Sequence, residues 1–224
     1  MESATDKIAN ALYESGCIKF GSFKIKSGAL SPYYIDMARL LSNPKELETI
    51  AEIAAQKVHQ IATINPLTKL ASIELKGALI VPIIACKANL PCVIVRKEEK
   101  AYGATGRIAG ADVIDEDKIL FVDDVVSEGL SKIEGIKTLQ ESGVEIKHIL
   151  VIVNREQGGK EKKKKAGYTV HALAKVSEVV TSLQKYGKIS SDQAETVLTY
   201  IKKYFFILFF FLQLWFHIFV ELPL

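Results

Sequence analysis

Apolar residues along the chain gather into short runs separated by amphipathic stretches, a pattern that predicts alternating strands and helices. Strand-like runs lie at 70–73, 92–95, 119–122 and 149–153, and they are rich in the β-branched and aromatic side chains of buried strands. Helical patterns follow each run except the second. Strands and helices that alternate in this way form βαβ units, so we predict an α/β fold with a doubly wound parallel sheet.

The amino-terminal part of the chain follows a different pattern. Residues 7–15 are typical of a helix, 18–36 of a strand, a turn and a second strand, and 44–61 of a longer helix that begins after Ser42 and Asn43. We therefore expect a small strand pair to precede the main sheet.

The strand predicted at 119–122 leads directly into residues that carry chemistry. Asp123 and Asp124 follow it, and a small, hydroxylated turn at 127–131 then opens a helix. Open α/β sheets bind ligands at the carboxyl ends of their strands, and the N–H groups at a helix N-terminus favour a phosphate. Carboxylates suit ribose hydroxyls or a developing positive charge on a sugar ring. The segment predicts a sugar-phosphate site, and the alternative is an acidic strand end followed by a Ser N-cap.

A charged segment at 96–109 follows the strand predicted at 92–95 and lacks helical periodicity. We expect a long exposed loop, and loops of this length are usually functional or disordered. Arg96, Lys97 and Lys100 would lie at the same sheet edge as the acid pair, where a pyrophosphate needs cations. Such a loop would also keep water from a ribosyl oxocarbenium-like state. The alternative is a solvated charged loop.

Composition is that of one ordinary globular domain with a real core: 224 residues, 49% hydrophobic and 25% charged, with a net charge of +3. We expect no nucleic-acid partner, because the basic run at 160–165 has no interleaved aromatics and indicates a solvated helix face or loop. Cys17, Cys86 and Cys92 show no C-x-x-C spacing, and no signal peptide is evident, which favours free thiols in the cytoplasm. The four histidines lack metal-ligand spacing, so we predict no protein metal site.

The acid-pair segment at 119–131 resembles the signature with which type I phosphoribosyltransferases bind phosphoribosyl pyrophosphate (PRPP). In that family a hydrophobic strand, two acids and a loop rich in Thr, Ser and Gly hold the ribose 5-phosphate. Two residues depart from the pattern: Glu128 adds a negative charge beside the phosphate, and Leu130 replaces a small or hydroxylated residue. PRPP affinity is the property that these departures would alter.

Further segments narrow the resemblance to the orotate phosphoribosyltransferases, over about residues 1–203. Each resembles one functional segment of that family: an N-terminal hood at 18–36, a pyrophosphate loop at 74–77, a catalytic lid at 96–103 and an orotate loop at 154–159, where Asn154 stands in place of the usual Asp. The resemblance implies a type I phosphoribosyltransferase sheet with a small hood formed by the N-terminal segment.

The resemblance also implies a reaction, a cofactor and an assembly. The reaction is transfer of the phosphoribosyl group of PRPP to orotate, which gives orotidine 5-monophosphate and pyrophosphate in de novo pyrimidine (UMP) biosynthesis. Mg²⁺ is the expected cofactor, since it accepts few protein ligands and many phosphate oxygens. Family members are homodimers whose lid reaches the neighbouring site, so we expect the same here.

Position by position, the resemblance gives each site residue a role. The catalytic residues would be Lys100, Tyr102, Asp123 and Asp124, with Tyr102 where many members have His. PRPP would be bound by Lys76, Arg96, Lys97, Lys100, Asp123, Asp124, Val125, Val126, Ser127, Glu128, Gly129, Leu130 and Ser131. Orotate would be bound by Lys26, Tyr33, Tyr34, Ser127 and Arg155.

Several alternatives stay open. Tyr33 and Tyr34 fit ordinary hood packing, Arg155 a surface ion pair and Lys26 a solvated strand position. At the level of function, the rivals are a phosphoribosyltransferase for another base and a non-catalytic module that senses PRPP or a nucleotide. The Lys-Ser-Gly hood and Arg155 argue against the first rival, and the complete lid argues against the second.

The last 21 residues, 204–224, differ from the domain before them. They hold seven of the ten Phe residues and one charged side chain, Glu221. A helix over 205–220 would span about 24 Å, short of a hydrocarbon core of about 30 Å, although Lys202 and Lys203 precede it as a cytoplasmic flank would. Three roles stay open: a membrane anchor, a helix packed on the domain or dimer, and an extension without selected function.

Overall fold

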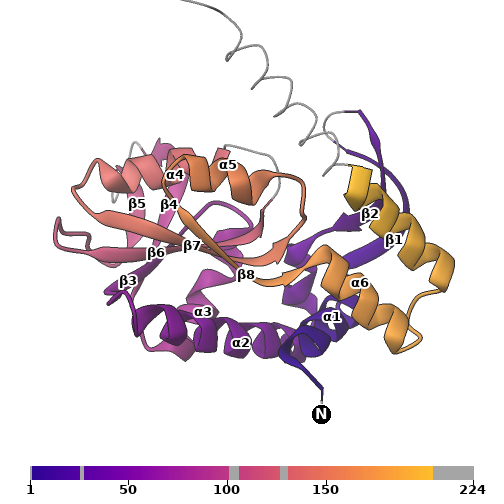
Figure 1. The fold of residues 1–224 in the computed structure, drawn as a ribbon. Coiled ribbons are helices and arrows are strands. Elements are labelled where there is room, and N and C mark those ends of the chain that lie inside the picture. The colour runs from indigo at the N-terminus through magenta and orange to yellow at the C-terminus, as the bar shows by residue number, and fades with distance from the viewer. Residues whose placement is uncertain (1, 26–27, 101–105, 127–130, 204–224) are drawn as a thin grey trace, which may run out of the picture.

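The computed structural model describes residues 2–25, 28–100, 106–126 and 131–203. These residues form a six-stranded sheet with helices on both faces and, beside it, a separate two-stranded sheet (Figure 1). The strands of the large sheet are β3 (Lys69–Ile73), β4 (Cys92–Lys100), β5 (Gly106–Gly110), β6 (Lys118–Val126), β7 (Glu145–Asn154) and β8 (Thr169–Lys175). The helices are α1 (Ala4–Glu14), α2 (Pro44–Ala62), α3 (Val81–Ala88), α4 (Ser131–Gln140), α5 (Gly159–Lys165) and α6 (Val176–Lys185), with 3-10 turns at Met37–Ser42 and Gly77–Leu79 and a further helical stretch at 191–203.

The large sheet is doubly wound, as predicted. Its strand order is β5-β4-β3-β6-β7-β8, and all neighbouring pairs run parallel except β4 and β5. From β3 the chain moves outward to β4 and β5 and then returns to place β6 on the other side of β3. The strand order therefore reverses between β3 and β6, and ligands of open α/β sheets bind at such a switch point.

Alternation along the strands explains why their sequences are almost continuously apolar. Leu120 and Val122 contact the core beneath α1, α2, α3 and α6, whereas Ile119 and Phe121 contact the core beneath α4. Successive strand residues point to opposite faces, so a strand covered on both sides must be apolar at nearly every position. The same alternation fixes which side chains near the strand end face which layer.

The amino-terminal strand pair forms the predicted hood. Strands β1 (Ile18–Lys24) and β2 (Leu30–Ile35) pair antiparallel and lie beside the large sheet, next to α6 and the helical stretch 191–203 (Figure 1). Tyr33 is buried and Tyr34 is exposed, so the two adjacent tyrosines belong to opposite faces of β2.

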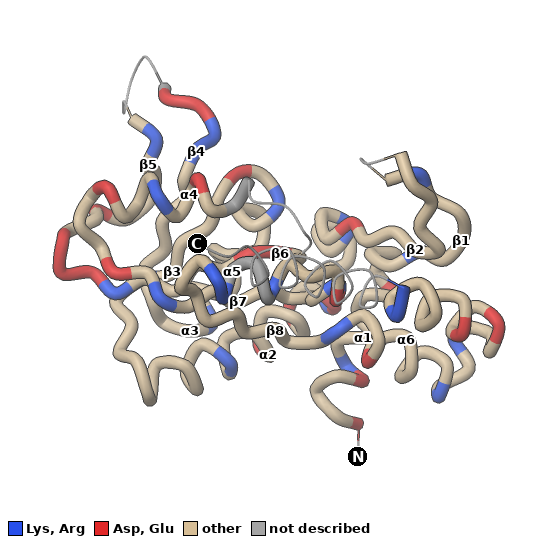
Figure 2. Tube along the Cα trace, turned by 45° about the horizontal axis from the view of Figure 1, so that its top comes forward, with Lys and Arg blue, Asp and Glu red and all other residues tan. Residues whose placement is uncertain are grey.

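The prediction of a long loop at 96–109 is wrong for the residues that the structure describes. Strand β4 continues to Lys100, and residues 106–110 form β5 beside it. The pairing is interrupted between Val95 and Lys100, so the charged residues there show no regular strand period. The charged residues of this hairpin project beyond the sheet (Figure 2), and residues 101–105, including Tyr102, lie outside the described residues.

Strand β6 is also longer than predicted. It extends from Lys118 to Val126, so Asp123 and Asp124 lie inside the strand. Strand β7 continues alongside and pairs Asp123 with Val151 and Val126 with Asn154. Backbone pairing with a neighbour therefore overrides the polar side chains that marked a strand end in the sequence.

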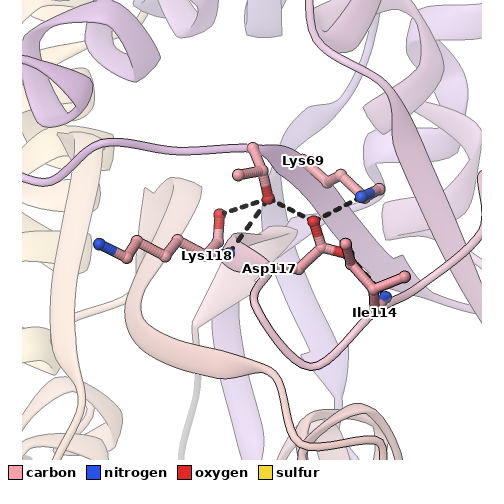
Figure 3. A network of polar contacts seen from close by, with 5 residues as sticks. Lys69, Ile114, Asp117 and Lys118 are labelled. Carbon is pink, nitrogen blue, oxygen red and sulfur yellow. Dashed lines mark hydrogen bonds and ion pairs between the residues drawn. The ribbon is translucent and has the colours of Figure 1, made fainter.

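Another buried acid, Asp117, lies just before the amino end of β6 (Figure 3). Its carboxylate accepts hydrogen bonds from the Thr68 hydroxyl at 2.7 Å and from the Ile114 backbone N–H at 2.9 Å, and it pairs with Lys69. Burial by itself raises the pKa of Asp117, but these hydrogen bonds outweigh burial and lower the pKa below its usual value. The network ties the starts of β3 and β6 together.

Cys17, Cys86 and Cys92 are free thiols, as predicted. Among the described residues, none of the helices combines the length and the apolar character needed to cross a membrane. The segment 204–224, to which the membrane-anchor alternative applies, lies outside them.

Candidate active site

The acid pair lies at the carboxyl end of β6, beside the switch point. The exposed fractions of Asp123 and Asp124 are 3% and 6%, and the Asp124 backbone N–H donates to Asp123 Oδ1 at 2.8 Å. Buried carboxylates are costly unless they are paired or hydrogen-bonded. Two consecutive ones at the ligand-binding edge of a sheet are therefore typical of a functional site.

The loop that follows β3 packs directly against the acid pair. A Cβ atom at Gly77 would lie 3.1 Å from Asp123 Oδ1 and only 2.0 Å from Ser72 Oγ, so the loop approaches this closely because residue 77 is glycine. The same loop carries Lys76, whose Nζ lies 3.2 Å from Asp36 Oδ1 at the end of the hood. A lysine from the loop after β3, an acid from the hood and the acid pair are thus neighbours.

The base of the β4–β5 hairpin adjoins that loop. The Lys97 backbone N–H donates to Glu74 Oε2 at 3.2 Å, and Arg96 Nη1 donates to the Gly106 carbonyl at 3.1 Å. Arg96 is half-buried and the Lys97 side chain is exposed. Lys100 ends β4, and its side chain lies outside the described part of the chain.

Arg155 follows β7 and connects the acid-pair strand with the hood. Its backbone N–H donates to the Val126 carbonyl at 3.1 Å, and its Nε donates to the Tyr33 hydroxyl at 3.3 Å. The guanidinium Cζ also lies 4.9 Å from the centroid of the Tyr33 ring, a cation–π distance. Nη2 is buried and has no hydrogen-bond partner within the described part of the chain, so this edge holds a charged donor that an anionic ligand could satisfy.

The two hood tyrosines occupy different environments. Tyr33 is fully buried between Arg155 and Tyr200, whose ring centroid lies 6.1 Å from its own, and burial raises the pKa of the Tyr33 phenol. Tyr34 is 43% exposed and its ring lies 5.7 Å from that of Phe23. The structure thus brings Tyr33 to Arg155 and places Tyr34 on the opposite face of the hood.

Two residues that the sequence analysis did not assign hold Arg155 in place. The Asn154 side chain accepts from the Glu156 backbone N–H at 2.9 Å, and Glu156, with a φ of 57°, accepts through its carboxylate from the Ser177 N–H at 2.9 Å. Ser177 lies in the first turn of α6, where free N–H groups favour a carboxylate. The sequence signal for this turn was Asn154 itself, since an Asn side chain readily forms a hydrogen bond with the backbone two residues later.

Most of the predicted site residues that are described lie at one edge of the sheet. This set comprises Tyr33, Lys76, Arg96, Lys97, Asp123, Asp124, Val125, Val126 and Arg155. Ser131 is described as the start of α4, without its side chain. Lys26, Tyr102, Ser127, Glu128, Gly129 and Leu130 lie outside the described residues.

A cavity of about 620 Å³ opens between the hood and the helical stretch 191–203, with Leu30, Ser31, Thr196 and Tyr200 among its lining residues. None of its lining residues comes from the carboxyl ends of β3, β4, β6 or β7. The candidate active site is therefore the polar sheet edge and not this cavity, although Tyr200 contributes to the surroundings of both.

Comparison with known proteins identifies the family that this chain resembles. A model of the phosphoribosyl transferase domain matches residues 36–185. The orotate phosphoribosyltransferase of Pyrococcus horikoshii is 39% identical over 189 residues, which cover 84% of this chain and 98% of that protein. The uridine 5'-monophosphate synthase of Bos taurus is 33% identical over 200 residues, 89% of this chain and 41% of that protein.

Solved structures agree with the sequence comparison. The UMP synthase of Leishmania donovani superposes with a TM-score of 0.79 at 30% identity, covering 90% of this chain and 43% of that one. The orotate phosphoribosyltransferase from Aeropyrum pernix superposes with a TM-score of 0.68 at 25% identity, covering 82% of this chain and 99% of that one.

Proposed function

This chain belongs to the orotate phosphoribosyltransferase family, and we propose that it transfers the phosphoribosyl group of PRPP to orotate and releases pyrophosphate. The observation that carries the proposal is the convergence, at one edge of the sheet, of a buried acid pair, a close-packed glycine loop and a guanidinium whose buried Nη2 has no hydrogen-bond partner among the described residues. The acids and the loop suit a sugar phosphate, and the guanidinium suits a carboxylate.

At the PRPP end we assign the pyrophosphate to cations and the ribose to carboxylates. The positive charge comes from Lys76, Arg96, Lys97 and Lys100. The ribose hydroxyls donate hydrogen bonds to Asp123 and Asp124, and the 5-phosphate is bound by segment 127–131. During transfer the bond from ribose C1 to a pyrophosphate oxygen breaks and a bond to an orotate ring nitrogen forms, and the proton of that nitrogen is lost. Positive charge develops on the ribose between these events, and the nearby carboxylates stabilise it.

At the orotate end, Arg155 binds the carboxylate. Its Nε donates a hydrogen bond to the Tyr33 hydroxyl, and we assign the buried Nη2 as a donor to the substrate carboxylate. A fully buried Tyr33 therefore positions the guanidinium, and Tyr34, Lys26 and Ser127 are assigned to the rest of the orotate site. Tyr102 is assigned to proton donation to the leaving pyrophosphate.

Mg²⁺ is the cofactor that we propose to bind with PRPP. Oxygens of the pyrophosphate and the ribose of PRPP would supply most of its ligands, because Mg²⁺ accepts few protein ligands and many phosphate oxygens. When bound, the ion neutralises charge on the departing pyrophosphate.

The proposal is tested by PRPP-dependent consumption of orotate, with and without Mg²⁺, with hypoxanthine as a second acceptor. We expect turnover of orotate that requires Mg²⁺ and little transfer to hypoxanthine, because a purine offers no carboxylate to Arg155. Preference for hypoxanthine would assign the chain to another base, and PRPP binding without any transfer would favour a sensing module.

We further propose a homodimer in which the hairpin of one subunit completes the site of the other. Lys100→Ala should lower turnover far more than it weakens orotate binding, because the charge matters most as pyrophosphate departs. If the site is shared, mixing inactive Lys100→Ala and Asp124→Asn subunits should restore part of the activity. An absence of recovery after demonstrated subunit exchange would contradict the shared site.

We propose that the catalytic domain ends near Lys203 and that residues 204–224 are an addition to it. In support, 84% of this chain accounts for 98% of the Pyrococcus horikoshii relative. A chain ending at Lys203 should fold and turn over orotate like the full chain, and it should be more soluble because a large apolar segment is gone. A large fall in Tm on truncation would contradict this boundary, and flotation of the full chain with vesicles would identify a membrane anchor.

A further inference from the structure

The β4–β5 hairpin departs from regular pairing at the residues proposed to bind pyrophosphate. Val95 pairs with Ile108 and Lys100 pairs with Gly106. Four residues of β4, 96–99, therefore lie opposite one residue of β5, Arg107, which is an extended bulge. Bulges re-aim side chains and are common beside active sites, but they also lose ladder hydrogen bonds, so something else must hold the strand here.

On the β3 side of β4, Glu74 holds the bulged part of the strand by two hydrogen bonds. Its backbone N–H donates to the Val95 carbonyl at 2.9 Å and its carboxylate accepts from the Lys97 N–H at 3.2 Å. The contacts with Glu74 thus lie on both sides of Arg96. Glu74 also belongs to the loop that carries Lys76, so the two pyrophosphate-binding segments are joined through it.

On the other side, Arg107 spans the bulge and reaches a helix. Its Nε donates to the Arg96 carbonyl at 3.2 Å, and its Nη2 lies 3.3 Å from Glu134 Oε1 in the first turn of α4. Arg96 in turn donates through Nη1 to the Gly106 carbonyl at 3.1 Å. The bulge is therefore connected to α4, the helix that follows the proposed 5-phosphate segment.

We propose that Glu74 and Arg107 are positioning residues, which close the bulge in β4 and hold Arg96 and Lys97 where the pyrophosphate of PRPP binds. This inference rests on the proposed function for the identity of the ligand. Neither residue is assigned a contact with substrate. Both act through backbone groups of the strand that carries the cations, and Glu134 orients Arg107 from α4.

The experiment measures binding of magnesium pyrophosphate by calorimetry, together with KM for PRPP and KM for orotate. We expect Arg107→Gln and Glu74→Ala each to weaken pyrophosphate binding and raise KM for PRPP about tenfold, the effect of one lost hydrogen bond that involves a charged group. KM for orotate should stay within about twofold, and Tm should change by only about 2 °C, because the contacts lie at a half-exposed edge. Lys137→Gln, which removes an exposed cation from α4, is the matched control and should change nothing.

Two conservative variants separate positioning from direct contact. In Glu74→Gln the amide oxygen can still accept from Lys97 N–H, so binding should largely recover relative to Glu74→Ala. Glu134→Gln should weaken pyrophosphate binding about threefold, since an exposed ion pair contributes modestly. If Arg107 instead contacted the pyrophosphate itself, Glu134→Gln would free its guanidinium and leave pyrophosphate binding unchanged or tighter. That result would overturn the positioning role.

Unchanged pyrophosphate affinity in both Arg107→Gln and Glu74→Ala would also overturn the inference. Its failure is distinguishable from failure of the proposed function, because pyrophosphate binding is measured without an acceptor base. A wild-type protein that binds pyrophosphate but transfers nothing to orotate would remove the proposed function only.

Discussion

The two ends of strand β6 carry buried acids in contrasting surroundings. At the amino end, Asp117 is enclosed by Thr68, Lys69 and the Ile114 N–H, all from the protein itself (Figure 3). At the carboxyl end, Asp123 and Asp124 lie against a glycine loop at the switch point of the sheet. Residue type and burial are the same at both ends, so neither identifies function by itself.

The difference between the ends comes from sheet topology. In a parallel sheet the amino ends of the strands share one edge and the carboxyl ends share the other, and the loops that hold ligands leave from the carboxyl ends. Asp117 joins two strand starts and serves stability, whereas Asp123 and Asp124 face the edge where the cation-bearing segments converge.

The largest effect is expected for Asp124→Asn, which keeps the shape of the side chain and removes its charge. Turnover of orotate should fall by about two to three powers of ten, the usual loss when one electrostatic stabiliser is removed. PRPP binding should remain measurable and Tm should change little. Steady-state kinetics and calorimetric PRPP binding test this, and parental turnover would remove Asp124 from the mechanism.

The matched change at the other end is Asp117→Asn. It leaves Lys69 without its charged partner in a buried network, and the free energy of unfolding should fall by about 3 kcal/mol, equivalent to a Tm lower by roughly 10 °C for a chain of this size. Denaturant unfolding measures the loss. Turnover per folded molecule should stay at the parental value, and a selective fall in turnover would contradict the assignment of this end to stability.

The close approach of the glycine loop to the acid pair is tested by Gly77→Ala. The new Cβ would meet Ser72 Oγ at 2.0 Å, so the loop must shift away from Asp123, and overpacking of this kind costs about 1–3 kcal/mol. KM for PRPP should rise as well. Removing the obstructing hydroxyl should restore part of both losses in Ser72→Ala/Gly77→Ala, because Ser72 Oγ has no hydrogen-bond partner among the described residues. A double variant as impaired as Gly77→Ala would show that the clash lies elsewhere.

The smallest effect concerns a titrating pair on β7 and β8. His148 Nδ1 lies 3.1 Å from His171 Nε2, and burial together with His148, Lys57 and Lys160 lowers the pKa of His171 to about 4. In the unfolded chain His171 has its ordinary pKa of about 6.5, so it binds a proton at a higher pH than in the folded chain. Stability therefore falls as the pH decreases from about 6.5 to about 4.

His171→Gln should remove that dependence. The variant should be less sensitive to acid than the parent by about 1 kcal/mol at pH 5.5, as measured by unfolding at pH 7.5 and 5.5. The pH dependence of turnover by folded protein should be the same in both, since the pair is remote from the carboxyl-end edge. Equal acid sensitivity in the two proteins would mean that His171 does not titrate as described.

The helices and strands with a strong hydrophobic period were predictable. Helix α2 runs over Pro44–Ala62 against a predicted 44–61, and the four main strands lie where the apolar runs indicated. The β4–β5 hairpin was not predictable from its charges, because contacts with the loop after β3 and with β5 hold it, and local sequence does not report those neighbours. The contact between His148 and His171, 23 residues apart, was hidden for the same reason.

The chain's sequence by itself determined the fold class and the order in which the acid pair, the cations and Arg155 follow the apolar runs at 119–122, 92–95 and 149–153, because strand periodicity and strand direction are local properties that place such residues at one edge of a parallel sheet. Only the tertiary structure decided which residues meet. It brought Arg155 Nε to Tyr33, closed the β4 bulge with Glu74 and Arg107, and enclosed Asp117 with Lys69. These are contacts between segments distant in sequence, and their geometry depends on packing of the whole domain.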